Sequence, residues 1–472
     1  MSLTLSDSFT SFVAEILDDV TRVEDERPPG ATAAVGTTVP FSAMDELCFH
    51  LDSERHPWTI EVEVRAPGEI DEQRLRMAVV AAADRHPMAR ARQRPYRLTD
   101  RQYEWEILSR FDTDPVWVVR APDDETMDER RAQILSAGVP LDQAPPFRVW
   151  LVRRPGGDSI ILAANHVATD GLGAFRLLRS IVRAYAGVVD DVPAIDLVAD
   201  RDLAANASPG SLVEHVERAV GVALSMRRAT GRRSRLARVG GEDDAAGFVF
   251  THLVIPRDEL ARIDTKRHID ATLNDVLLAA LHLAISDWNA DHAQETERLS
   301  VMMPMNHRPD HARHEGVGNF ALMVSVSTRP KDRDDAASLV TAIAQQTSLA
   351  KRAGTATVLL DVLDQRSLLP AVAKKAIPLL SPLSRDALID TAVLSNVGAL
   401  AEPFDFGAGP GGGIAIEVWF SPPARMPLGV GVGAVTHDGD LHLSFRSCAA
   451  QFDASAATAF ASYVRAALDF VG

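Results

Sequence analysis

The stretch from residue 159 to residue 185, SIILAANHVATDGLGAFRLLRSIVRAY, limits the possible folds more than any other part of the sequence. Residues 159–164 form a short apolar run with two adjacent isoleucines, which predicts a largely buried strand. The Asp-Gly pair at 170–171 marks a tight turn. Beyond the turn, apolar residues recur at helical spacing and predict an amphipathic helix with one face in a core. The stretch therefore predicts a strand, a polar turn and a helix in immediate succession.

The polar turn carries residue types that suit proton transfer. His166 follows the predicted strand, and Asp170 stands four residues later. The ordinary pKa of histidine is about 6.5, so its imidazole can accept a proton near neutral pH and act as a general base. A hydrogen-bonded structural histidine beside a turn is the commoner role of a lone histidine. The turn by itself leaves both interpretations open.

The order His-x-x-x-Asp-Gly between a strand and a long helix resembles the active-site motif of the chloramphenicol-acetyltransferase-like superfamily. This superfamily includes nonribosomal-peptide condensation domains, alcohol acyltransferases and the wax ester synthase/diacylglycerol acyltransferase family. Its motif usually has two histidines in a row, of which the second is catalytic, and the aspartate is mainly structural. This chain has Asn165 in the first position and His166 in the second. The resemblance therefore implies that His166 is the general base and that Asp170 and Gly171 shape the turn.

Two further segments resemble parts of the same superfamily. The string RHPMARAR at 85–92 resembles the segment that closes the first helix of condensation-type domains. We expect His86 in this string to be a cation at a helix C-terminus rather than a catalytic group. Arg308 follows a predicted strand, where the superfamily has an arginine that pairs with the motif aspartate. The resemblance implies a buried pair of Asp170 and Arg308 with a structural role.

Four polar residues are candidates for binding a developing oxyanion or for positioning the substrate. Ser395 and Asn396 resemble the Ser-Asn strand that lies beside the catalytic histidine in the superfamily, although a strand that ends in turn-forming residues is an equally good interpretation. A hydrogen bond to an oxyanion often contributes about 2.7–4 kcal/mol to transition-state stabilisation. The four candidates are Asn165, Asn319, Ser395 and Asn396.

Composition restricts the class of protein. A length of 472 residues favours two lobes of roughly 200 residues each. The net charge of −16 argues against nucleic-acid binding. Cys48 and Cys448 are the only cysteines, and no metal-ligand spacing or nucleotide-phosphate fingerprint occurs, so we expect neither a disulfide framework nor a metal site. Without a signal-peptide pattern or an 18-residue apolar window, we expect a cytoplasmic protein with no membrane span.

The order of predicted elements indicates a mixed α/β fold. We predict an N-terminal extension helix at 1–38, an N-terminal lobe with the histidine motif at 39–200, a connection at 201–245 and a C-terminal lobe at 246–472. The resemblance implies that the two lobes are similar, that their sheets are mixed, and that a tunnel between them holds His166 near its middle.

The connection between the lobes contains the arginine-rich run RRATGRRSRLAR at 227–238. A solvated linker face is the default interpretation of such a run. The alternative is a landing patch for an anionic partner, such as an acidic carrier protein or the phosphate of a nucleotide.

The resemblance implies an enzyme that transfers an acyl group from a thioester to the hydroxyl or amine of a small-molecule acceptor. The donor would be an acyl-CoA or a phosphopantetheine-linked acyl group on an acyl or peptidyl carrier protein, and no cofactor would be bound permanently. The motif contains no serine or cysteine nucleophile, and no G-x-S-x-G elbow occurs, so we favour direct transfer over an acyl-enzyme.

Two other functions stay open from the sequence. The Asn274–Asp275 pair and Ser395–Asn396 resemble elements of the wax ester synthase/diacylglycerol acyltransferase branch, whereas Asn165 and the absence of Pro-Gly-Pro after the Ser-Asn strand speak against it. The string RHPMARAR favours a free-standing condensation or alcohol-acyltransferase enzyme. A catalytically silent binding or scaffold protein on the same fold is the second of these functions, because Asn165 departs from the motif.

Overall fold

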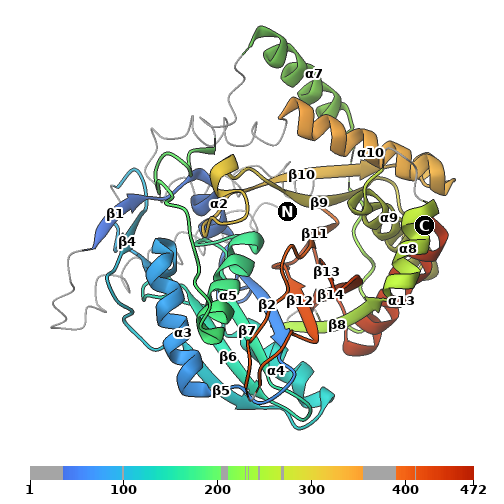
Figure 1. Ribbon diagram of the computed structural model, residues 1–472. Helices are drawn as coiled ribbons and strands as arrows, with labels where there is room; N and C mark the ends of the chain where they lie inside the picture. The colour runs from blue at the N-terminus through green and yellow to red at the C-terminus, as the bar shows by residue number, and fades with distance from the viewer. Residues whose placement is uncertain are drawn as a thin grey trace, which may run out of the picture.

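The computed structural model describes residues 36–97, 100–203, 211–228, 230–231, 233–242, 245–266, 271–354, 390–409 and 411–471. In this part of the chain the strands form three sheets, and helices cover them (Figure 1). The predicted mixed α/β class is therefore confirmed. The predicted extension helix over residues 5–20 lies outside the described residues.

The sheet of the first lobe has five strands with β7 near its centre. Its order is β12 (Glu417–Ser421), β2 (Thr59–Arg65), β7 (Ser159–Asn165), β6 (Phe147–Arg153) and β5 (Val116–Arg120). The pairs are antiparallel except for the parallel pair of β5 and β6. Every residue of β7 is buried, because helices cover both faces of the sheet. Burial on two faces explains why the sequence of β7 is a continuous apolar run rather than an alternation.

Three helices cover the two faces of this sheet. On one face, α3 (Glu72–Arg85) and α5 (Gly171–Ala186) pack against each other and share the largest core with alternate residues of β2 and β7. On the other face, α4 (Asp124–Ser136) packs on the remaining residues of β6 and β7. A smaller three-stranded sheet lies beside the lobe together with α2 (Ala43–Leu51); its strands are β1 (Thr37–Pro40), β4 (Glu104–Ile107) and β3 (Ala91–Gln93).

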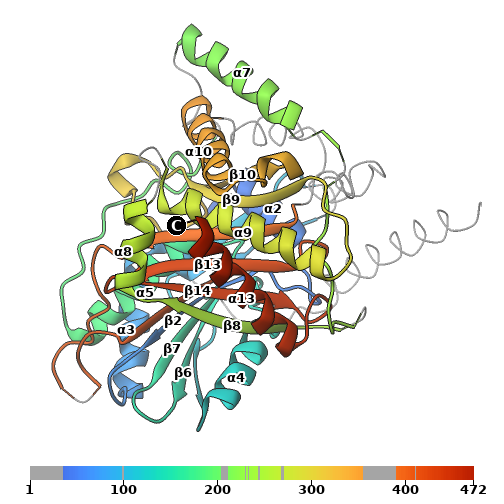
Figure 2. The same ribbon diagram turned by 90° about the vertical axis from the view of Figure 1, so that its right-hand side faces the viewer.

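The sheet of the second lobe has six strands. Its order is β10 (Ala321–Thr328), β9 (Leu299–Asn306), β11 (Ala392–Ala399), β13 (Val430–His437), β14 (Asp440–Cys448) and β8 (Phe248–Ile255). Figure 2 shows the helices that cover its outer face, α8 (Arg257–Lys266), α9 (Leu273–Asp291), α10 (Ala336–Ala353) and α13 (Ala454–Val471). Helix α7 (Leu212–Arg228) stands outside this layer and packs against α10.

Strand β12 ties the two lobes together. It belongs to the sequence range predicted for the C-terminal lobe, yet it pairs with β2 in the sheet of the first lobe. The backbone of β12 also approaches β13 so closely that a Cβ on Gly433 would overlap the Phe420 carbonyl oxygen. In addition, the buried Arg446 of β14 donates from Nη1 to the carbonyl oxygen of Thr59, at 2.6 Å. The lobes therefore share backbone contacts, and the C-terminal range is not a separate unit.

Candidate active site

The turn after β7 presents His166 between the two lobes. Its backbone N–H donates to the carbonyl oxygen of Trp58, just before β2, at 2.8 Å. The indole of Trp58 lies parallel to the imidazole, with an interplanar angle of 10° and ring centroids 6.1 Å apart. Helix α5 begins at Gly171, so the predicted order of strand, turn and helix is confirmed. Both the backbone and the ring of His166 are held by the segment before the neighbouring strand.

A hydrogen bond determines which nitrogen of His166 carries the proton. Nδ1 lies 3.0 Å from the carbonyl oxygen of Thr169, and a carbonyl can only accept. Nδ1 is therefore the donor, and Nε2 keeps its lone pair. Among the described residues Nε2 has no hydrogen-bond partner, and His166 is 5% exposed to solvent. Burial lowers the pKa of His166, an effect that the charge of Asp170 partly opposes. The ring is thus neutral near pH 7, with a free lone pair on Nε2.

A buried ion pair closes the turn. The guanidinium of Arg308, which follows β9, donates to both carboxylate oxygens of Asp170, at 2.9 and 2.5 Å. The side chains of the two residues are only 1% and 3% exposed. The same carboxylate accepts from the backbone N–H of Gly173 as the N-cap of α5 and from that of Phe320, both at 2.9 Å. Asp170 therefore joins the start of α5 to two segments of the second lobe.

Asn319 holds the backbone of the histidine turn. Its Nδ2 donates to the carbonyl oxygen of His166 at 2.9 Å and contacts Sγ of Cys48 at 3.4 Å. Both amide hydrogens are used, so the expectation that Asn319 binds an oxyanion is corrected: the residue positions the turn. Burial raises the pKa of the Cys48 thiol to about 12, and Cys48 is therefore not a nucleophile at neutral pH.

Asn165 is likewise a structural residue. Its Nδ2 donates to Oδ2 of Asp52 at 3.0 Å and to the carbonyl oxygen of Val139 at 2.8 Å, while its Oδ1 accepts from the backbone N–H of Val167 at 2.9 Å. No amide hydrogen is left for an oxyanion or a substrate, which corrects that expectation. The exchange of the first motif histidine for asparagine is accommodated by this set of partners.

Ser395 and Asn396 lie on opposite faces of β11. Asn396 is in register with Ala434, which belongs to the core under the outer helices, and its Oδ1 accepts from the backbone N–H of Gly398 at 2.9 Å. Asn396 therefore does not face the first lobe, contrary to expectation, because side chains alternate along a strand. Ser395 is in register with Gly433, beside the Phe420 carbonyl.

Phe420 connects the Ser395 position to the histidine turn. A Cβ on Gly171 would lie 2.8 Å from the Phe420 ring, so a larger residue at the start of α5 would displace this ring. Among the described residues the Ser395 hydroxyl has no hydrogen-bond partner. Of the four candidate donors, Ser395 is the one that combines an unused donor with the face toward the first lobe.

Several residues of the site could not be found from the sequence. Trp58, Asp52 and the carbonyl oxygen of Thr169 have no motif that links them to His166. They reach it only because β2 pairs with β7 and because the turn folds back on itself.

Among the described residues, no group of three His, Cys, Asp or Glu side chains is arranged to hold a metal ion. None of the described helices is long and apolar enough to cross a membrane.

His86 differs from the expected cation. The structure buries it at the end of α3, where Nε2 lies 2.7 Å from the Ser180 hydroxyl. Burial, assisted by the charge of Arg176, lowers its pKa to about 3. His86 is therefore neutral at pH 7, because removing the charged ring from water outweighs any attraction to the helix C-terminus.

We expect His86→Gln to flatten the dependence of stability on pH. The folded-state pKa lies below the ordinary value, so the unfolded chain takes up the proton first and wild-type stability falls as pH decreases from about 6.5 toward 3. The slope should decrease by about 1.4 kcal/mol per pH unit in that range. Urea denaturation at several pH values measures it. The exposed His314→Gln is the control, and equal slopes in both variants would contradict the assignment.

Two uncharacterized mycobacterial proteins are similar to this chain over most of its length. An uncharacterized protein of Mycobacterium tuberculosis, Rv2305 of strain H37Rv, is 34% identical over 433 residues, which cover 91% of this chain and 98% of the relative. The chain belongs to the Rv2305 family. Its counterpart in strain CDC 1551, MT2362, matches over the same extent. No protein-family model matches the chain.

Solved structures give the fold of this Rv2305 family member. The first condensation domain of the calcium-dependent antibiotic synthetase, in complex with a substrate analogue, has a TM-score of 0.67 at 14% identity and covers 93% of this chain and 98% of its own. The starter condensation domain of rhizomide synthetase, in complex with C8-CoA, has a TM-score of 0.65 at 16% identity, covering 92% and 95%. The epimerization domain of tyrocidine synthetase B has a TM-score of 0.61 at 18% identity, covering 94% and 98%. The chloramphenicol-acetyltransferase-like fold is thereby confirmed.

Proposed function

We propose that this protein is an acyltransferase that transfers an acyl group from a thioester to the hydroxyl or amine of a small-molecule acceptor, with Nε2 of His166 as the general base. The observation that carries the proposal is the 3.0 Å contact of Nδ1 of His166 with the carbonyl oxygen of Thr169, which sets the tautomer of the ring. Thr169 holds the proton on Nδ1, and Nε2 is left unprotonated and without a partner in the described part of the chain. A lowered pKa keeps the ring in this form.

The proposed reaction is a direct transfer. As Nε2 of His166 takes the proton from the acceptor, the acceptor oxygen or nitrogen forms a bond to the thioester carbonyl carbon. The carbonyl electrons move to the oxygen, and a donor such as Ser395 stabilises that charge. When the carbonyl re-forms, the C–S bond breaks, and the thiolate takes up the proton from the imidazolium. The products are an ester or an amide and a free thiol, and the histidine returns to its initial state.

The position of the base supports this chemistry. The carbonyl oxygen of Thr169 fixes Nδ1, and hydrogen bonds to Trp58 and Asn319 fix the backbone of His166. Asp170 holds the whole turn through Gly173 and Arg308. A base held on several sides loses little freedom in the transition state. The tunnel that would bring donor and acceptor together stays a prediction. Complexes of fold neighbours with C8-CoA and with a substrate analogue motivate the choice of substrates below.

The proposal predicts acceptor-dependent thiol release from an acyl thioester. A panel of acyl-CoAs from short to long chains, each with and without small alcohol and amine acceptors, can be followed with a thiol reagent. We expect release above the acceptor-free rate for at least one combination, and mass spectrometry should detect the ester or amide. A preference for long chains and long alcohols would favour the wax ester synthase/diacylglycerol acyltransferase alternative.

A second donor series makes this test decisive. The same acyl groups are offered on pantetheine and on a phosphopantetheinylated carrier protein. Release only from the carrier would assign a condensation-type donor. If no donor and no acceptor supports release by a folded wild-type protein that still binds acyl-CoA or carrier, the enzyme proposal is wrong and the scaffold alternative replaces it.

A further inference from the structure

Four arginines converge at one edge of the second lobe. They come from the end of α7, the segment after it, the start of β9 and the end of β10, and they are Arg228, Arg233, Arg298 and Arg329. Arg233 and Arg298 are neighbours in an isolated parallel β-bridge. Arg228 and Arg329 line one pocket together with Ser327, Asp332, Ala342 and Gln346. The arginine-rich run at 227–238 thus contributes two members, and the other two are distant in sequence.

Two of these arginines are buried without enough partners. Arg233 is 6% exposed and Arg298 is 3% exposed. Nε and Nη1 of Arg233 and Nε of Arg298 are enclosed and have no hydrogen-bond partner among the described residues. Burial of a charged group is unfavourable unless the charge is paired and its hydrogen bonds are made. Nη1 and Nη2 of Arg298 do donate, to Ser327 and to the carbonyl oxygen of Gly231, so the deficit is one of unused N–H donors, which suits a ligand that accepts hydrogen bonds.

Ser327 links the buried arginines to the pocket. Ser327 lines the pocket, and its hydroxyl accepts from Nη1 of Arg298 at 3.3 Å. Burial, and to a lesser extent the charges of Arg233 and Arg329, lowers the pKa of Arg298 to about 10, and the charge of Asp390 opposes the shift. Like charges are thus close enough to disfavour one another. The pocket is lined by the exposed pair, Arg228 and Arg329, and Ser327 in its lining connects it to Arg298 of the buried pair.

The carboxylates nearby do not neutralise the cluster. Among the described residues, Asp390 is the one carboxylate within ion-pair distance of any of the four arginines, 3.5 Å from Nη1 of Arg233. Its two oxygens already accept from the hydroxyls of Ser300 at 2.5 Å and Ser325 at 2.9 Å. Asp332 accepts from the backbone N–H of Arg329 at 2.8 Å. Four guanidinium groups face two carboxylates, so the cluster keeps a positive excess.

We propose that Arg228, Arg233, Arg298 and Arg329 form a binding site for a phosphate group. A tetrahedral, doubly charged phosphate offers several acceptor oxygens, which suits guanidinium donors that approach from different sides. The phosphate is either the free ion or part of a soluble nucleotide or CoA. The phosphate site and its test are independent of the proposed acyl transfer.

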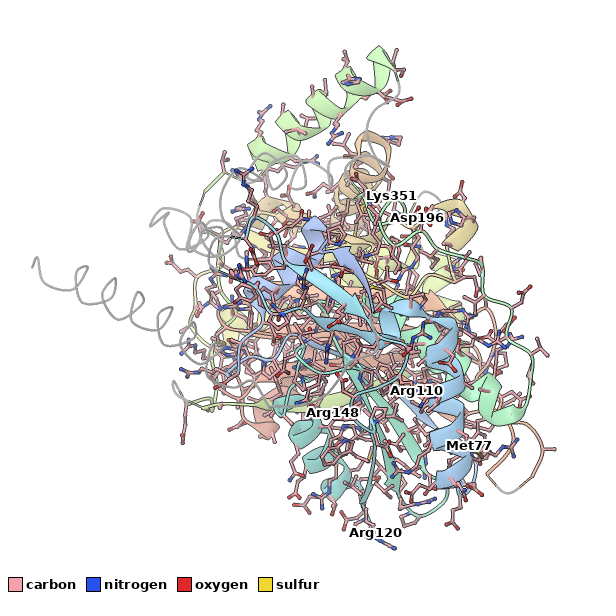
Figure 3. All side chains as sticks on the ribbon, turned by 90° about the vertical axis from the view of Figure 1, so that its left-hand side faces the viewer. Met77, Arg110, Arg120, Arg148, Asp196 and Lys351 are labelled. Carbon is pink, nitrogen blue, oxygen red and sulfur yellow. The ribbon has the colours of Figure 1, made fainter. Side chains whose placement is uncertain are left out.

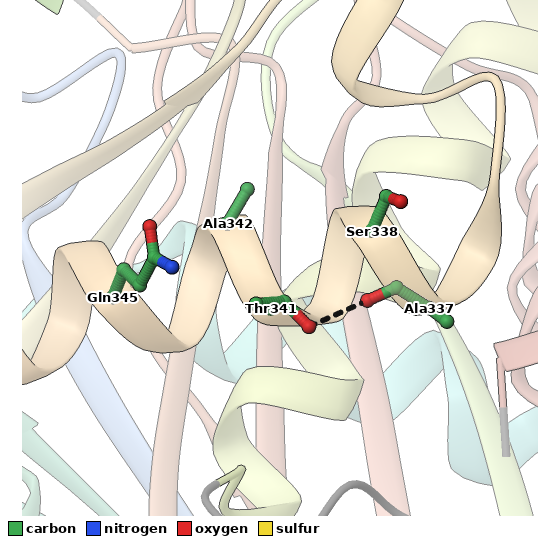
Figure 4. A pocket seen from close by; sticks show the side chains of 5 residues that line it. All are labelled: Ala337, Ser338, Thr341, Ala342 and Gln345. Atoms are coloured by element: carbon green, nitrogen blue, oxygen red, sulfur yellow. Dashed lines mark hydrogen bonds between the residues drawn. The ribbon is translucent and has the colours of Figure 1, made fainter.

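The site is separate from the histidine turn. Arg298 directly precedes β9, and Arg308 follows the other end of this strand. Eight residues at about 3.3 Å each place the two ends on the order of 25 Å apart. A depression beside the arginine pocket, on α10, shares Ala342 with it. Figure 4 shows that its lining has no charged side chain, and it is not part of the site.

Thermal unfolding in phosphate tests the site. Melting temperatures are measured in potassium phosphate and in potassium chloride at equal ionic strength and pH, with ADP and CoA as separate additions. We expect a phosphate-dependent rise in the wild-type melting temperature that saturates with concentration, because a ligand that binds only the folded state stabilises it. If the melting temperature saturates at a lower concentration of ADP or CoA than of phosphate, the phosphate belongs to the larger ligand. If it saturates at an equal or higher concentration, the ligand is the free ion. No rise with any of them would overturn the proposal.

Two variants and a matched control separate binding from general salt effects. Arg329→Gln, at the exposed mouth, should weaken the apparent phosphate affinity at least about tenfold. Arg233→Met should raise the melting temperature in chloride, since it removes a buried charge whose ion pair with Asp390 is long, at 3.5 Å, and should abolish the phosphate response. Arg120→Gln removes an exposed arginine on β5, at the opposite end of the molecule from Lys351 of α10 (Figure 3), and should respond like the wild type.

Either variant can contradict the site. If Arg329→Gln responds to phosphate as strongly as Arg120→Gln, the effect of phosphate is non-specific and the proposal is wrong. The same holds if Arg233→Met is destabilised in chloride but keeps the full phosphate response, because Arg233 is then a structural residue. Should Arg233→Met fail to fold, Arg329→Gln alone decides the question, since its side chain is exposed.

Discussion

Replacing His166 by alanine is expected to lower acceptor-dependent thiol release by about 10²–10⁴-fold, the range typical of a lost general base. The variant removes Nε2, the group proposed to take the acceptor proton, and leaves the segments that shape the turn in place. The ion pair of Asp170 and Arg308 and the hydrogen bond from Asn319 to the His166 carbonyl do not depend on the imidazole. We therefore expect the loss mainly in kcat, with a small change in melting temperature.

The control for this variant is a buried histidine outside the site. His282 on α9 is fully buried, and its Nδ1 lies 2.8 Å from the Thr328 hydroxyl. His282→Ala should destabilise the protein and preserve kcat of the folded fraction. A His166→Ala protein that turns over at the wild-type rate would show that the base lies elsewhere.

The pH dependence gives an independent readout on His166. Burial lowers its pKa, so the neutral, proton-accepting form persists below pH 6.5. The acid limb of the wild-type kcat/KM profile should accordingly lie below pH 6.5. This limb should be absent from the residual activity of His166→Ala.

Removing the Arg308 side chain is expected to cost about 3–5 kcal/mol in the free energy of unfolding, because Asp170 would remain buried without its counter-ion. Arg308→Met should show this loss in urea denaturation. Arg308→Lys keeps the charge but lacks the two separate nitrogens that donate to the two carboxylate oxygens in parallel, so a smaller loss is expected together with a fall in turnover. The turnover falls because Asp170 caps α5 and thereby positions the turn.

Surface and double variants test the reason for this cost. Arg313→Lys, in an exposed pair with Asp310, should change stability by no more than about 0.5 kcal/mol. The double variant Asp170→Asn with Arg308→Met should cost less than the sum of the single changes, since no charge is then left buried alone. If Arg308→Lys leaves both the melting temperature and turnover at wild-type levels, the role assigned to the pair is wrong.

Local patterns in the sequence were sufficient for the elements that carry the site. The apolar run ending at Asn165 and the helical periodicity after Asp170 predicted β7, the turn and α5, because strand and helix periods are properties of consecutive residues. The motif also pointed to the contact between Asp170 and Arg308, although it could not supply the distance. The motif could not show whether a polar side chain has an unused hydrogen-bond donor.

The roles of the polar residues around His166 depended on the tertiary structure. Asn165 and Asn319 are equivalent as amides in the sequence, yet both use their hydrogens on protein partners that come from other elements. Asn396 directly follows Ser395 in β11, so its side chain lies on the opposite face of the strand. His86 precedes a proline at a helix end, and only the packing of α5 over it removes its charge.

The sequence by itself therefore determined the fold class, the strand–turn–helix unit and the proton-accepting residue type at its turn, because these follow from the spacing of neighbouring residues. Only the tertiary structure decided that β12 crosses into the first lobe, that Thr169 sets the tautomer of His166, and that Arg298 and Arg329 join the arginine-rich run in one cluster. Each of these depends on segments far apart in the chain, and their pairing is set by the burial of whole faces, which no local pattern encodes.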